Sequence, residues 1–320
     1  MTDPTVDIIC SARDAGAYLD EALASVVSQT HRAWRLWLRD DGSRDDTASR
    51  AAVWAARDTR IRLLHTGGPP LGAVQGFGWL LAQLPADATW VACLDADDVW
   101  RPDRLAVTLR AGLAAEAGEA GERPVLVHSD CALIDDRGAV VAPSYWAAAG
   151  LRPEPTTVRR LAVQNVATGS TLLLNRALVR AIGAVPADAV HQDWWFALVA
   201  AVTGRVIGVA LPLVQYRQHA ANTVGATAGR LRGVTDALRR GAAAGPRTAR
   251  LRDDLRRTAR QAGALVRLHG DTLAAHDREA LQELAALPEL PFMARKRALL
   301  RHRILREHGV LRALGVLVRG

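Results

Sequence analysis

A short apolar run at residues 90–94 ends abruptly in the carboxylates of Asp95, Asp97 and Asp98. A run of this length, bounded by turn-forming residues, predicts a buried strand of a parallel sheet. Ligands of open α/β sheets bind beyond the carboxyl ends of the strands, which is where these acids fall. Because residues i and i+2 of an extended chain point the same way, Asp95 and Asp97 can face one ligand together.

Clustered carboxylates repel one another unless a positive charge lies between them. Mg²⁺ or Mn²⁺ carrying phosphate oxygens is the natural occupant, because hard divalent cations prefer oxygen ligands. The alternative is an acidic turn that opens the next helix, with Asp98 as its cap. This segment alone does not separate the two interpretations, and the rest of the chain has to decide between them.

The first part of the chain alternates between short apolar runs and segments with helical spacing of apolar residues. Such alternation predicts strand–helix units, and therefore a doubly wound, mostly parallel α/β sheet. The expected strands are residues 6–10, 36–38, 60–65 and 90–94, and the helices between and after them are residues 18–29, 45–57, 72–84 and 103–116.

Beyond residue 124 the pattern is less regular. Residues 143–165 are rich in Pro, Ala and Trp and suit a loop over a site, and Asn175 is placed to cap a short helix. The expected elements are strands at 125–128, 170–174 and 205–211, a hairpin turn at 135–138, and a helix that follows His191.

Charge divides the chain near residue 225. Residues 225–320 hold 20 Arg and Lys against 9 Asp and Glu, whereas residues 1–224 hold 21 against 24. Arg- and Leu-rich helical segments fill the basic part. We therefore expect a domain at 1–224 and a basic, α-helical C-terminal region at 225–320.

A helix with an arginine face and a leucine face suits an anionic membrane surface, so peripheral membrane contact is one expectation for the C-terminal region. A merely solvated helical face is the other. Nucleic-acid binding is disfavoured, because Phe292 is the only aromatic residue there. The sequence shows neither a signal peptide nor an apolar run of about 18 residues, and its three cysteines resemble buried hydrophobes, so we expect a cytoplasmic protein.

Two acid clusters, at Asp40–Asp41 and Asp95–Asp97, follow predicted strands, and Asp193 precedes two tryptophans. The first loop, residues 11–16, lacks both GxGxxG and GxxxxGK[ST], which argues against a dinucleotide fold and a P-loop. A nucleotide held through acids and a metal ion is the class of ligand that remains.

At these positions the chain resembles family 2 glycosyltransferases, which have the GT-A fold. Residues 40–47, Asp-Asp-Gly-Ser-Arg-Asp-Asp-Thr, are similar to the family's nucleotide-sugar signature, and Asp95-Ala96-Asp97 is similar to its D-x-D motif. Residues 18–23 are similar to the family's helix before that signature, and the resemblance covers roughly residues 5–225. The blocks at 168–171, 191–195 and 216–219 resemble rhamnosyltransferase-type members in particular.

The resemblance implies a role for each matched position. Asp14, Asp40, Asp41 and Asp95 would bind the donor nucleotide, Asp97 and His219 would hold the metal ion, and Asp193 would be the catalytic base. Gln192 stands where many members carry an acid, which leaves Asp193 as the one candidate base in its block. His219 could also serve as a phosphate contact or as an ordinary loop histidine.

The implied reaction moves a sugar, with rhamnose or another deoxyhexose as the leading expectation, from a nucleoside diphosphate sugar to a saccharide or lipid-linked hydroxyl. Direct attack on the anomeric carbon would invert it, and the setting would be bacterial surface polysaccharide synthesis. Two alternatives stay open at this point: a sugar-phosphate nucleotidyltransferase, and a non-catalytic, membrane-associated assembly partner.

Overall fold

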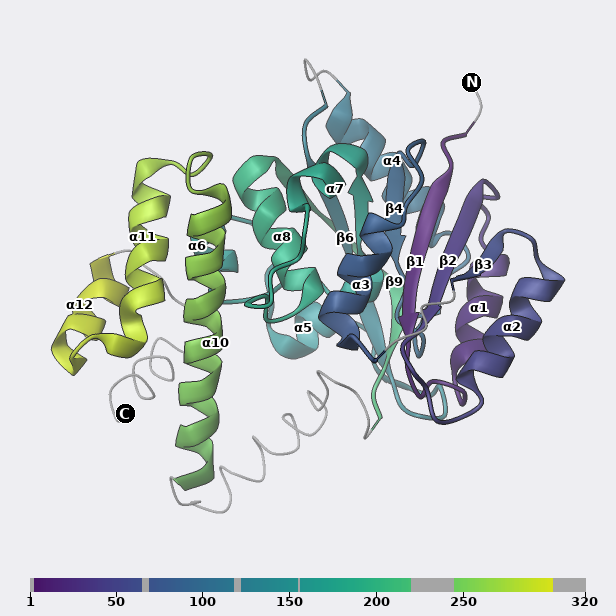
Figure 1. Ribbon diagram of the computed structural model, residues 1–320, viewed down its shortest axis with the longest axis horizontal. Helices are drawn as coiled ribbons and strands as arrows, with labels where there is room; N and C mark the ends of the chain where they lie inside the picture. The colour runs from purple at the N-terminus through teal and green to yellow at the C-terminus, as the bar shows by residue number, and fades with distance from the viewer. Residues whose placement is uncertain (1–2, 65–68, 118–121, 155, 220–244, 302–320) are drawn as a thin grey trace.

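The computed structural model describes residues 3–64, 69–117, 122–154, 156–219 and 245–301 (Figure 1). Within these residues a nine-stranded sheet runs in the order β3-β2-β1-β4-β8-β6-β9-β5, with β7 beside β6. The strands are β1 Val6–Ala12, β2 Trp34–Asp40, β3 Ile61–Leu64, β4 Trp90–Cys93, β5 Val99–Trp100, β6 Val125–Ile134, β7 Val140–Ala142, β8 Leu173–Asn175 and β9 Arg205–Arg217.

The helices lie on both faces of this sheet and beyond one end of it. In chain order the α-helices are α1 Leu19–Val27, α2 Thr47–Arg57, α3 Gly72–Ala82, α4 Arg104–Glu116, α5 Tyr145–Ala149, α6 Val158–Leu161, α7 Arg176–Ile182, α8 Gln192–Thr203, α10 Gly245–His269, α11 Ala275–Ala286 and α12 Phe292–Arg301. Short 3-10 turns form at Gly169–Thr171 (η1) and Leu287–Glu289 (η2).

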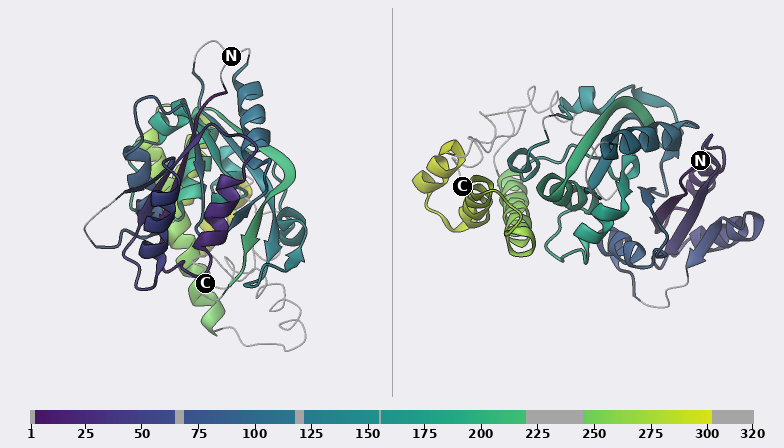
Figure 2. Two further views of the ribbon diagram at one scale, coloured as in Figure 1. Left: turned by 90° about the vertical axis from the view of Figure 1, so that its right-hand side faces the viewer. Right: turned by 90° about the horizontal axis from the view of Figure 1, so that it is seen from above.

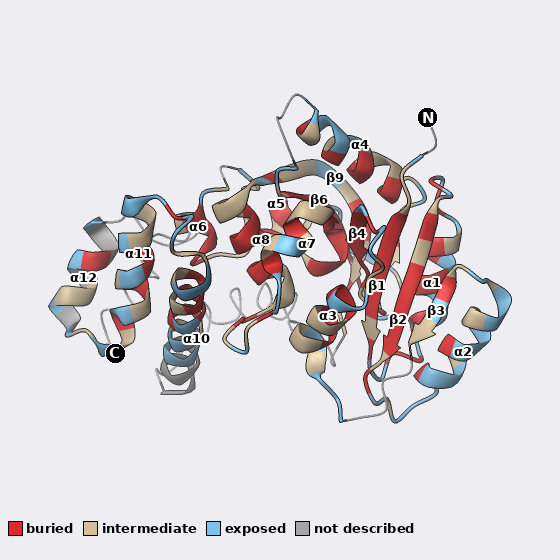
Figure 3. Cartoon of the chain, turned by 45° about the horizontal axis from the view of Figure 1, so that its top comes forward, coloured by how far each residue is buried: buried red, intermediate tan, exposed pale blue. Residues whose placement is uncertain are grey.

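The strands β3, β2, β1 and β4 are parallel neighbours, as the alternating pattern predicts. Their side chains alternate between two hydrophobic clusters, so Ile9 joins one cluster with α3 and α8 while Ile8 joins the other with α1 and α4. Both faces of β1 are therefore buried (Figure 3). This confirms the α/β fold and the doubly wound arrangement around β1.

The second half of the sheet is mixed. β8 pairs antiparallel with β4 and β6, and β5 pairs antiparallel with β9, while β6 and β9 are parallel. The expected strand at 205–211 continues without a break to Arg217, because a register shift near Asp130 of β6 absorbs the bend. Residues 170–171 lie in η1, and the strand begins only at Leu173.

Asn175 caps α7, as predicted, by accepting a hydrogen bond from the backbone N–H of Leu178 at 3.0 Å. The expected hairpin is also present, since β6 and β7 are antiparallel around the turn that contains Gly138, where φ is +87°. Residues 143–165 contain the short helices α5 and α6, which the irregular sequence does not predict.

The C-terminal helices lie beyond α8, at the end of the molecule opposite α2 (Figure 2). α10 packs on α8 through Ala262 and Leu265, and the side chain of Gln261 accepts a hydrogen bond from the N–H of Val190 at 2.8 Å. Asp277 of α11 pairs with Arg159 of α6 at 3.0 Å. The predicted domain boundary at residues 224 and 225 lies outside the described residues.

Some arginines of the basic C-terminal region form contacts within the fold. Arg295 donates to the carbonyl oxygen of Leu290 at 2.7 Å, and Arg301 pairs with Glu283 at 2.9 Å. Arg297 and Met293 of α12 are exposed. Every helix in the described ranges is too short or too polar to cross a bilayer.

Candidate active site

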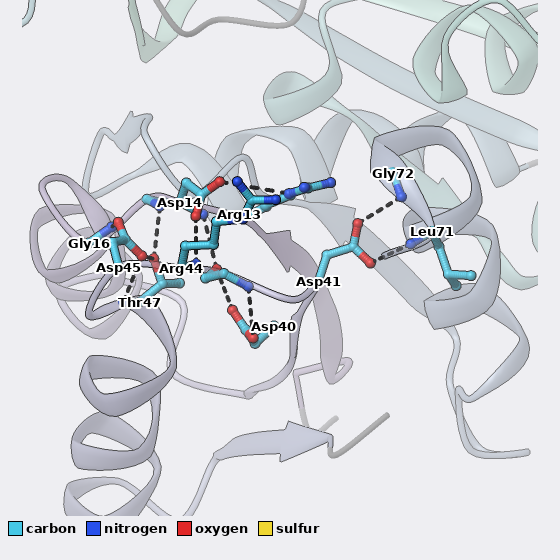
Figure 4. A network of polar contacts seen from close by, with 12 residues as sticks. Arg13, Asp14, Gly16, Asp40, Asp41, Arg44, Asp45, Thr47, Leu71 and Gly72 are labelled. Carbon is cyan, nitrogen blue, oxygen red and sulfur yellow. Dashed lines mark hydrogen bonds and ion pairs between the residues drawn. The ribbon is translucent and has the colours of Figure 1, made fainter. Parts of the chain in front are cut away.

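The loops that follow β1 and β2 are joined by hydrogen bonds (Figure 4). Because Ala12 and Asp40 are register partners on parallel strands, the two loops leave the sheet side by side. The N–H of Asp14 donates to the hydroxyl of Ser43 at 3.0 Å, and the N–H of Arg44 donates to the carboxylate of Asp14 at 2.8 Å. Ser43 in turn donates through its hydroxyl and its N–H to Asp40.

This network holds Asp14 in an unusual backbone conformation. Its φ of +48° lies in the left-handed region that side chains other than glycine rarely adopt. The bonds to Ser43 and Arg44 stabilise that conformation and keep the exposed Asp14 carboxylate beside Asp40, which is half-buried. Asp14 and Asp40 therefore lie together at the carboxyl ends of β1 and β2.

A second set of bonds fixes the far side of the same loops. Thr47, at the start of α2, accepts a hydrogen bond from the N–H of Ala15 at 2.8 Å, and Asp45 accepts one from Gly16 at 2.9 Å. Desolvation raises the pKa of Asp45, but hydrogen bonds from Thr47 and Gly16 outweigh it and leave that pKa below its ordinary value. Asp45 is thus held as an anion by the loop itself.

Asp41 has a different environment from Asp40. Its carboxylate accepts hydrogen bonds from the N–H groups of Leu71 and Gly72, each at 2.7 Å, and pairs with Arg39 at 2.8 Å. The side chains of Asp41 and Arg39 are only 3% and 2% exposed. These contacts hold the start of α3 in place, and the predicted donor contact of Asp41 stays a prediction.

A group of acids follows the carboxyl end of β4. Burial, together with the neighbouring charges of Asp97 and Asp193, raises the pKa of Asp95 to about 8. Burial and the charges of Asp97 and Asp95 also raise the pKa of Asp98, which is fully buried. Asp98 accepts a hydrogen bond from the N–H of Arg217 at 3.0 Å, so it is not the helix cap considered above.

Asp193 lies in the first turn of α8. It accepts a hydrogen bond from the N–H of Trp194 at 2.6 Å. Burial raises the pKa of Asp193 to about 6, and hydrogen bonds from Trp194, from the side chain of Asn165 and from the backbone of Gly169 limit the rise. A carboxylate with this pKa is ionised at neutral pH and is still a useful base.

Gly169 of η1 lies between the acids of β4 and α8. A Cβ atom on Gly169 would lie 3.2 Å from a carboxylate oxygen of Asp95 and 3.5 Å from the amide nitrogen of Gln192. Ser170 anchors the turn, because its hydroxyl accepts a hydrogen bond from the indole N–H of Trp100 at 3.1 Å. The absence of a side chain at Gly169 leaves space beside Asp95.

His219 follows β9 and returns to the same place. Its Nε2 lies 2.9 Å from a carboxylate oxygen of Asp97, and its ring stacks on Tyr18 with centroids 4.9 Å apart. The side chains of His219 and Asp97 are 14% and 24% exposed, so both reach the surface of the site.

This pair fits a divalent ion whose coordination is completed by its substrate. Carboxylate oxygen and imidazole nitrogen are ligands that Mn²⁺ accepts, and Mg²⁺ is commonly held by one or two carboxylates together with phosphate oxygens. Within the described ranges no group of three or more His, Cys, Asp or Glu side chains has the arrangement of a metal site.

The structure thus brings most of the predicted residues to one edge of the sheet. β2, β1 and β4 are adjacent parallel strands, so Asp14, Asp40, Asp95 and Asp97 all lie beyond their carboxyl ends. The influence of Asp193 on the pKa of Asp95 places α8 beside them. Asp41 alone points away, into the contact with α3.

Sequence reasoning did not identify Asn165, Ser170 or Arg217 as site residues. Asn165 falls in the irregular segment 143–165, and Ser170 begins an expected strand. The roles of both depend on contacts with Asp193 and Trp100 that are distant in sequence. Arg217 belongs to the 216–219 block that resembles the family, but one arginine among many gives no signal of its own.

Comparison with known proteins finds similarity to glycosyltransferases. Residues 7–120 match the family model described as glycosyl transferase family 2. The Escherichia coli glucosyltransferase WfgD is 34% identical over 105 residues, which are 33% of this chain and 40% of WfgD. The succinoglycan biosynthesis protein ExoW of Rhizobium meliloti is 42% identical over 91 residues, 27% of each protein.

The similarity in sequence is confined to part of each relative, because the matched stretches span 17% to 40% of the length of the curated proteins. The similarity in structure is wider. Residues 1–349 of Staphylococcus aureus TarS superpose with a TM-score of 0.56 at 13% identity, covering 93% of this chain and 89% of TarS. Residues 7–120 are therefore similar to glycosyltransferase family 2, and the fold of the chain is of the GT-A type.

Proposed function

We propose that the chain is an inverting glycosyltransferase that uses a nucleoside diphosphate sugar. The acceptor would be a hydroxyl of a saccharide or of a lipid-linked saccharide in bacterial surface polysaccharide synthesis. One observation carries the proposal: Asp95, Asp97 and Asp193 converge at one sheet edge with the pKa values of Asp95 and Asp193 raised, beside the loop pair that presents Asp14 and Asp40.

The two loops suit the nucleoside. Asp40 would accept a hydrogen bond from the ring edge of the base, and Asp14 would help to hold the nucleoside from the first loop. Asp95, on the neighbouring strand end, would lie near the ribose. The hydrogen bonds from Ser43 and Arg44 already order these loops, so little conformational entropy would be lost on binding.

Asp97 and His219 would hold Mg²⁺ or Mn²⁺. The bound ion would neutralise negative charge on the diphosphate as the sugar–phosphate bond breaks. The protein supports this role because both side chains reach the surface of the site and lie 2.9 Å apart.

Asp193 would be the general base. The acceptor hydroxyl must lose a proton as its oxygen attacks the anomeric carbon, and a carboxylate with a pKa of about 6 can take that proton at neutral pH. The bond from the N–H of Trp194 holds the carboxylate in one orientation. Attack from the face opposite the diphosphate inverts the anomeric configuration.

The curated relatives support the substrate class more than its details. The name of WfgD specifies UDP-glucose as donor and a diphosphoundecaprenol-linked sugar as acceptor, and TuaG of Bacillus subtilis, 30% identical over 102 residues, is a putative teichuronic acid biosynthesis glycosyltransferase. Of these two names, that of WfgD specifies a donor and an acceptor, and they belong to the classes proposed here. Rhamnose or another deoxyhexose remains our proposal for the donor sugar.

A thermal-shift panel tests the donor. We expect nucleoside diphosphates and their sugars, including UDP-glucose and dTDP-rhamnose, to raise the melting temperature more in the presence of Mn²⁺ than in its absence. The best donor is then incubated with lipid-linked and free saccharides, and the product's anomeric configuration is determined by NMR. Asp87→Asn is the matched control, because Asp87 is 71% exposed and pairs with Arg35 outside the site.

The same assays separate the alternatives. Release of pyrophosphate from a nucleoside triphosphate and a sugar phosphate would instead establish a nucleotidyltransferase. A melting temperature that nucleotides do not change, together with no hydrolysis of the donor, would indicate a non-catalytic protein.

We further propose that the basic C-terminal helices contact an anionic membrane surface. The exposed Arg297 and Met293 on α12 offer charge and an apolar side chain together. Cosedimentation with phosphatidylglycerol vesicles should weaken in a Met293→Glu, Arg297→Glu variant, and unchanged cosedimentation would reject this contact.

A further inference from the structure

Arg217, the last residue of β9, is a buried arginine whose guanidinium contacts main-chain carbonyls and one carboxylate. We propose that Arg217 is a positioning residue that holds Asp97 and His219 in place for the metal–diphosphate group. This inference rests on the proposed function, because it concerns how the same site is organised.

Arg217 connects four separate segments. Its Nε donates to the carbonyl oxygen of Asp97 at 2.9 Å, and its backbone N–H donates to Asp98 at 3.0 Å. Another guanidinium nitrogen donates to the carbonyl oxygens of Asp135 and Asp136, at 3.3 and 3.4 Å, in the turn between β6 and β7. The remaining one pairs with Glu21 of α1.

These bonds fix the backbone of Asp97 and leave its side chain free for the site. The guanidinium bonds the carbonyl oxygen of Asp97, whereas the Asp97 carboxylate faces His219. Had the guanidinium bonded the carboxylate, the positive charge would compete with a metal ion for the same oxygens. The geometry therefore orients the carboxylate without neutralising it.

The same residue also orders His219 through Tyr18. The guanidinium carbon of Arg217 lies 4.9 Å from the centroid of the Tyr18 ring, and the ring of His219 stacks on Tyr18 at 4.9 Å. Because only one residue separates Arg217 from His219, fixing Arg217 limits the positions that His219 can reach. α1, the loop after β4 and the end of β9 are thus joined at the metal-binding pair.

A substitution that keeps the length of the side chain and removes its donors tests the proposal. We expect Arg217→Met to bind UDP or dTDP without metal as the wild type does, and to lose most of the additional affinity that Mn²⁺ gives. Changes in residues that orient metal ligands typically weaken metal affinity by about 10–100-fold. Isothermal titration with each nucleotide, with and without Mn²⁺, measures this, and Mn²⁺ electron paramagnetic resonance reports metal binding without turnover.

Arg35→Met is the matched control. Arg35 also joins separate segments through carboxylates, with bonds of 2.8 Å to Asp7 and 3.2 Å to Asp87, but it lies at the opposite end of the strands from the site. We expect it to lower the melting temperature while keeping the Mn²⁺-dependent gain. Equal loss of that gain in both variants would mean that Arg217 has only a general structural role, and would overturn the proposal.

Glu21→Gln decides the question if Arg217→Met fails to fold. Glu21 is 55% exposed, so the fold should tolerate the change. We expect Glu21→Gln to lose less of the Mn²⁺-dependent gain in nucleotide affinity than Arg217→Met. The loss in Arg217→Lys should be intermediate. Full retention of the gain in folded Arg217→Met or Glu21→Gln would overturn this inference alone. A wild-type chain without any Mn²⁺-dependent gain would overturn the proposed function as well.

Discussion

The loops after β1 and β2 and the acid cluster after β4 lie at the same sheet edge, but their carboxylates have different environments. In the loops, Asp40, Asp41 and Asp45 accept hydrogen bonds from the protein's own N–H and O–H groups. In the cluster, Asp95 and Asp193 have no ion pair with any described residue, and the pKa of each is raised. The loop carboxylates therefore stabilise the conformation of the chain, whereas Asp95 and Asp193 lack a cationic partner in the described part of the chain and bind a proton more readily.

The difference follows from where the donors lie. A turn that leads into a helix supplies free N–H groups, and the starts of α2 and α3 provide these to Asp45 and Asp41. The guanidinium of Arg217, close to the acid cluster, donates to carbonyl oxygens and to Glu21 instead. The pKa values of Asp95 and Asp193 are therefore raised, which suggests that a ligand supplies the positive charge these acids lack.

The largest expected effect is the loss of the base in the cluster. Asp193→Asn should reduce sugar transfer by about 10²–10⁴-fold, the usual contribution of general acid–base catalysis. The melting temperature and donor binding should stay close to those of the wild type, because the amide oxygen can still accept from Trp194. Initial rates and melting curves, compared with Asp20→Asn in the first turn of α1, check this. Near-normal turnover would make Asp193 an ordinary first-turn residue.

Removing an acid of the loops should act on stability instead. Asp41→Asn leaves the buried Arg39 without its carboxylate, and breaking a buried ion pair typically costs about 3–5 kcal/mol of the free energy of unfolding. Denaturant titration measures the loss. The turnover number per folded molecule should change little at temperatures where the variant is folded. A large fall in turnover at unchanged stability would show that Asp41 acts on the donor after all.

The pH dependence of turnover should follow the ionisation of Asp193 in the acid cluster. A base with a pKa of about 6 in the free protein is lost as its carboxylate is protonated, so kcat/KM should fall about tenfold for each pH unit below 6. It should level off above that value until another group titrates. A profile that stays flat down to pH 4.5 in folded protein would contradict the assignment of Asp193.

The smallest effect concerns Asp95 in the free protein. Its pKa of about 8 in the fold lies above the ordinary value of 3.8, so the fold loses stability as the pH rises through this interval and Asp95 is forced to ionise. Asp95→Asn removes that cost. We expect its melting temperature to exceed that of the wild type by several degrees at pH 9 and to match it below pH 4. A lower melting temperature at pH 9 would show that the charged form of Asp95 stabilises the fold.

The sequence predicts one of these regions better than the other. The four parallel strands and their helices follow from period and turn residues, and acids directly after strands 36–38 and 90–94 had to reach one edge. Local pattern also predicts the cap at Asn175, because a capping bond spans only three residues.

Long-range contacts account for what the sequence did not predict. Asp40 and Asp41 are neighbours in the same motif. Asp41 accepts a hydrogen bond from the N–H of Leu71 because α3 begins beside it. The bond between Arg217 and Asp97 joins residues 120 positions apart. The continuous β9 likewise depends on its pairing with β6, since nothing local joins 205–211 to 214–217.

Proton release on binding tests the central claim most directly, namely that the cluster is kept uncompensated for a cation. At pH 7, Asp95 with its pKa of about 8 is mostly protonated, and a cation bound at Asp97 should drive that proton off. Isothermal titration of Mn²⁺ with UDP or dTDP, repeated in buffers of different ionisation enthalpy, should show close to one proton released in the wild type and little in Asp95→Asn. Nucleotide binding that neither depends on Mn²⁺ nor releases protons would contradict the account.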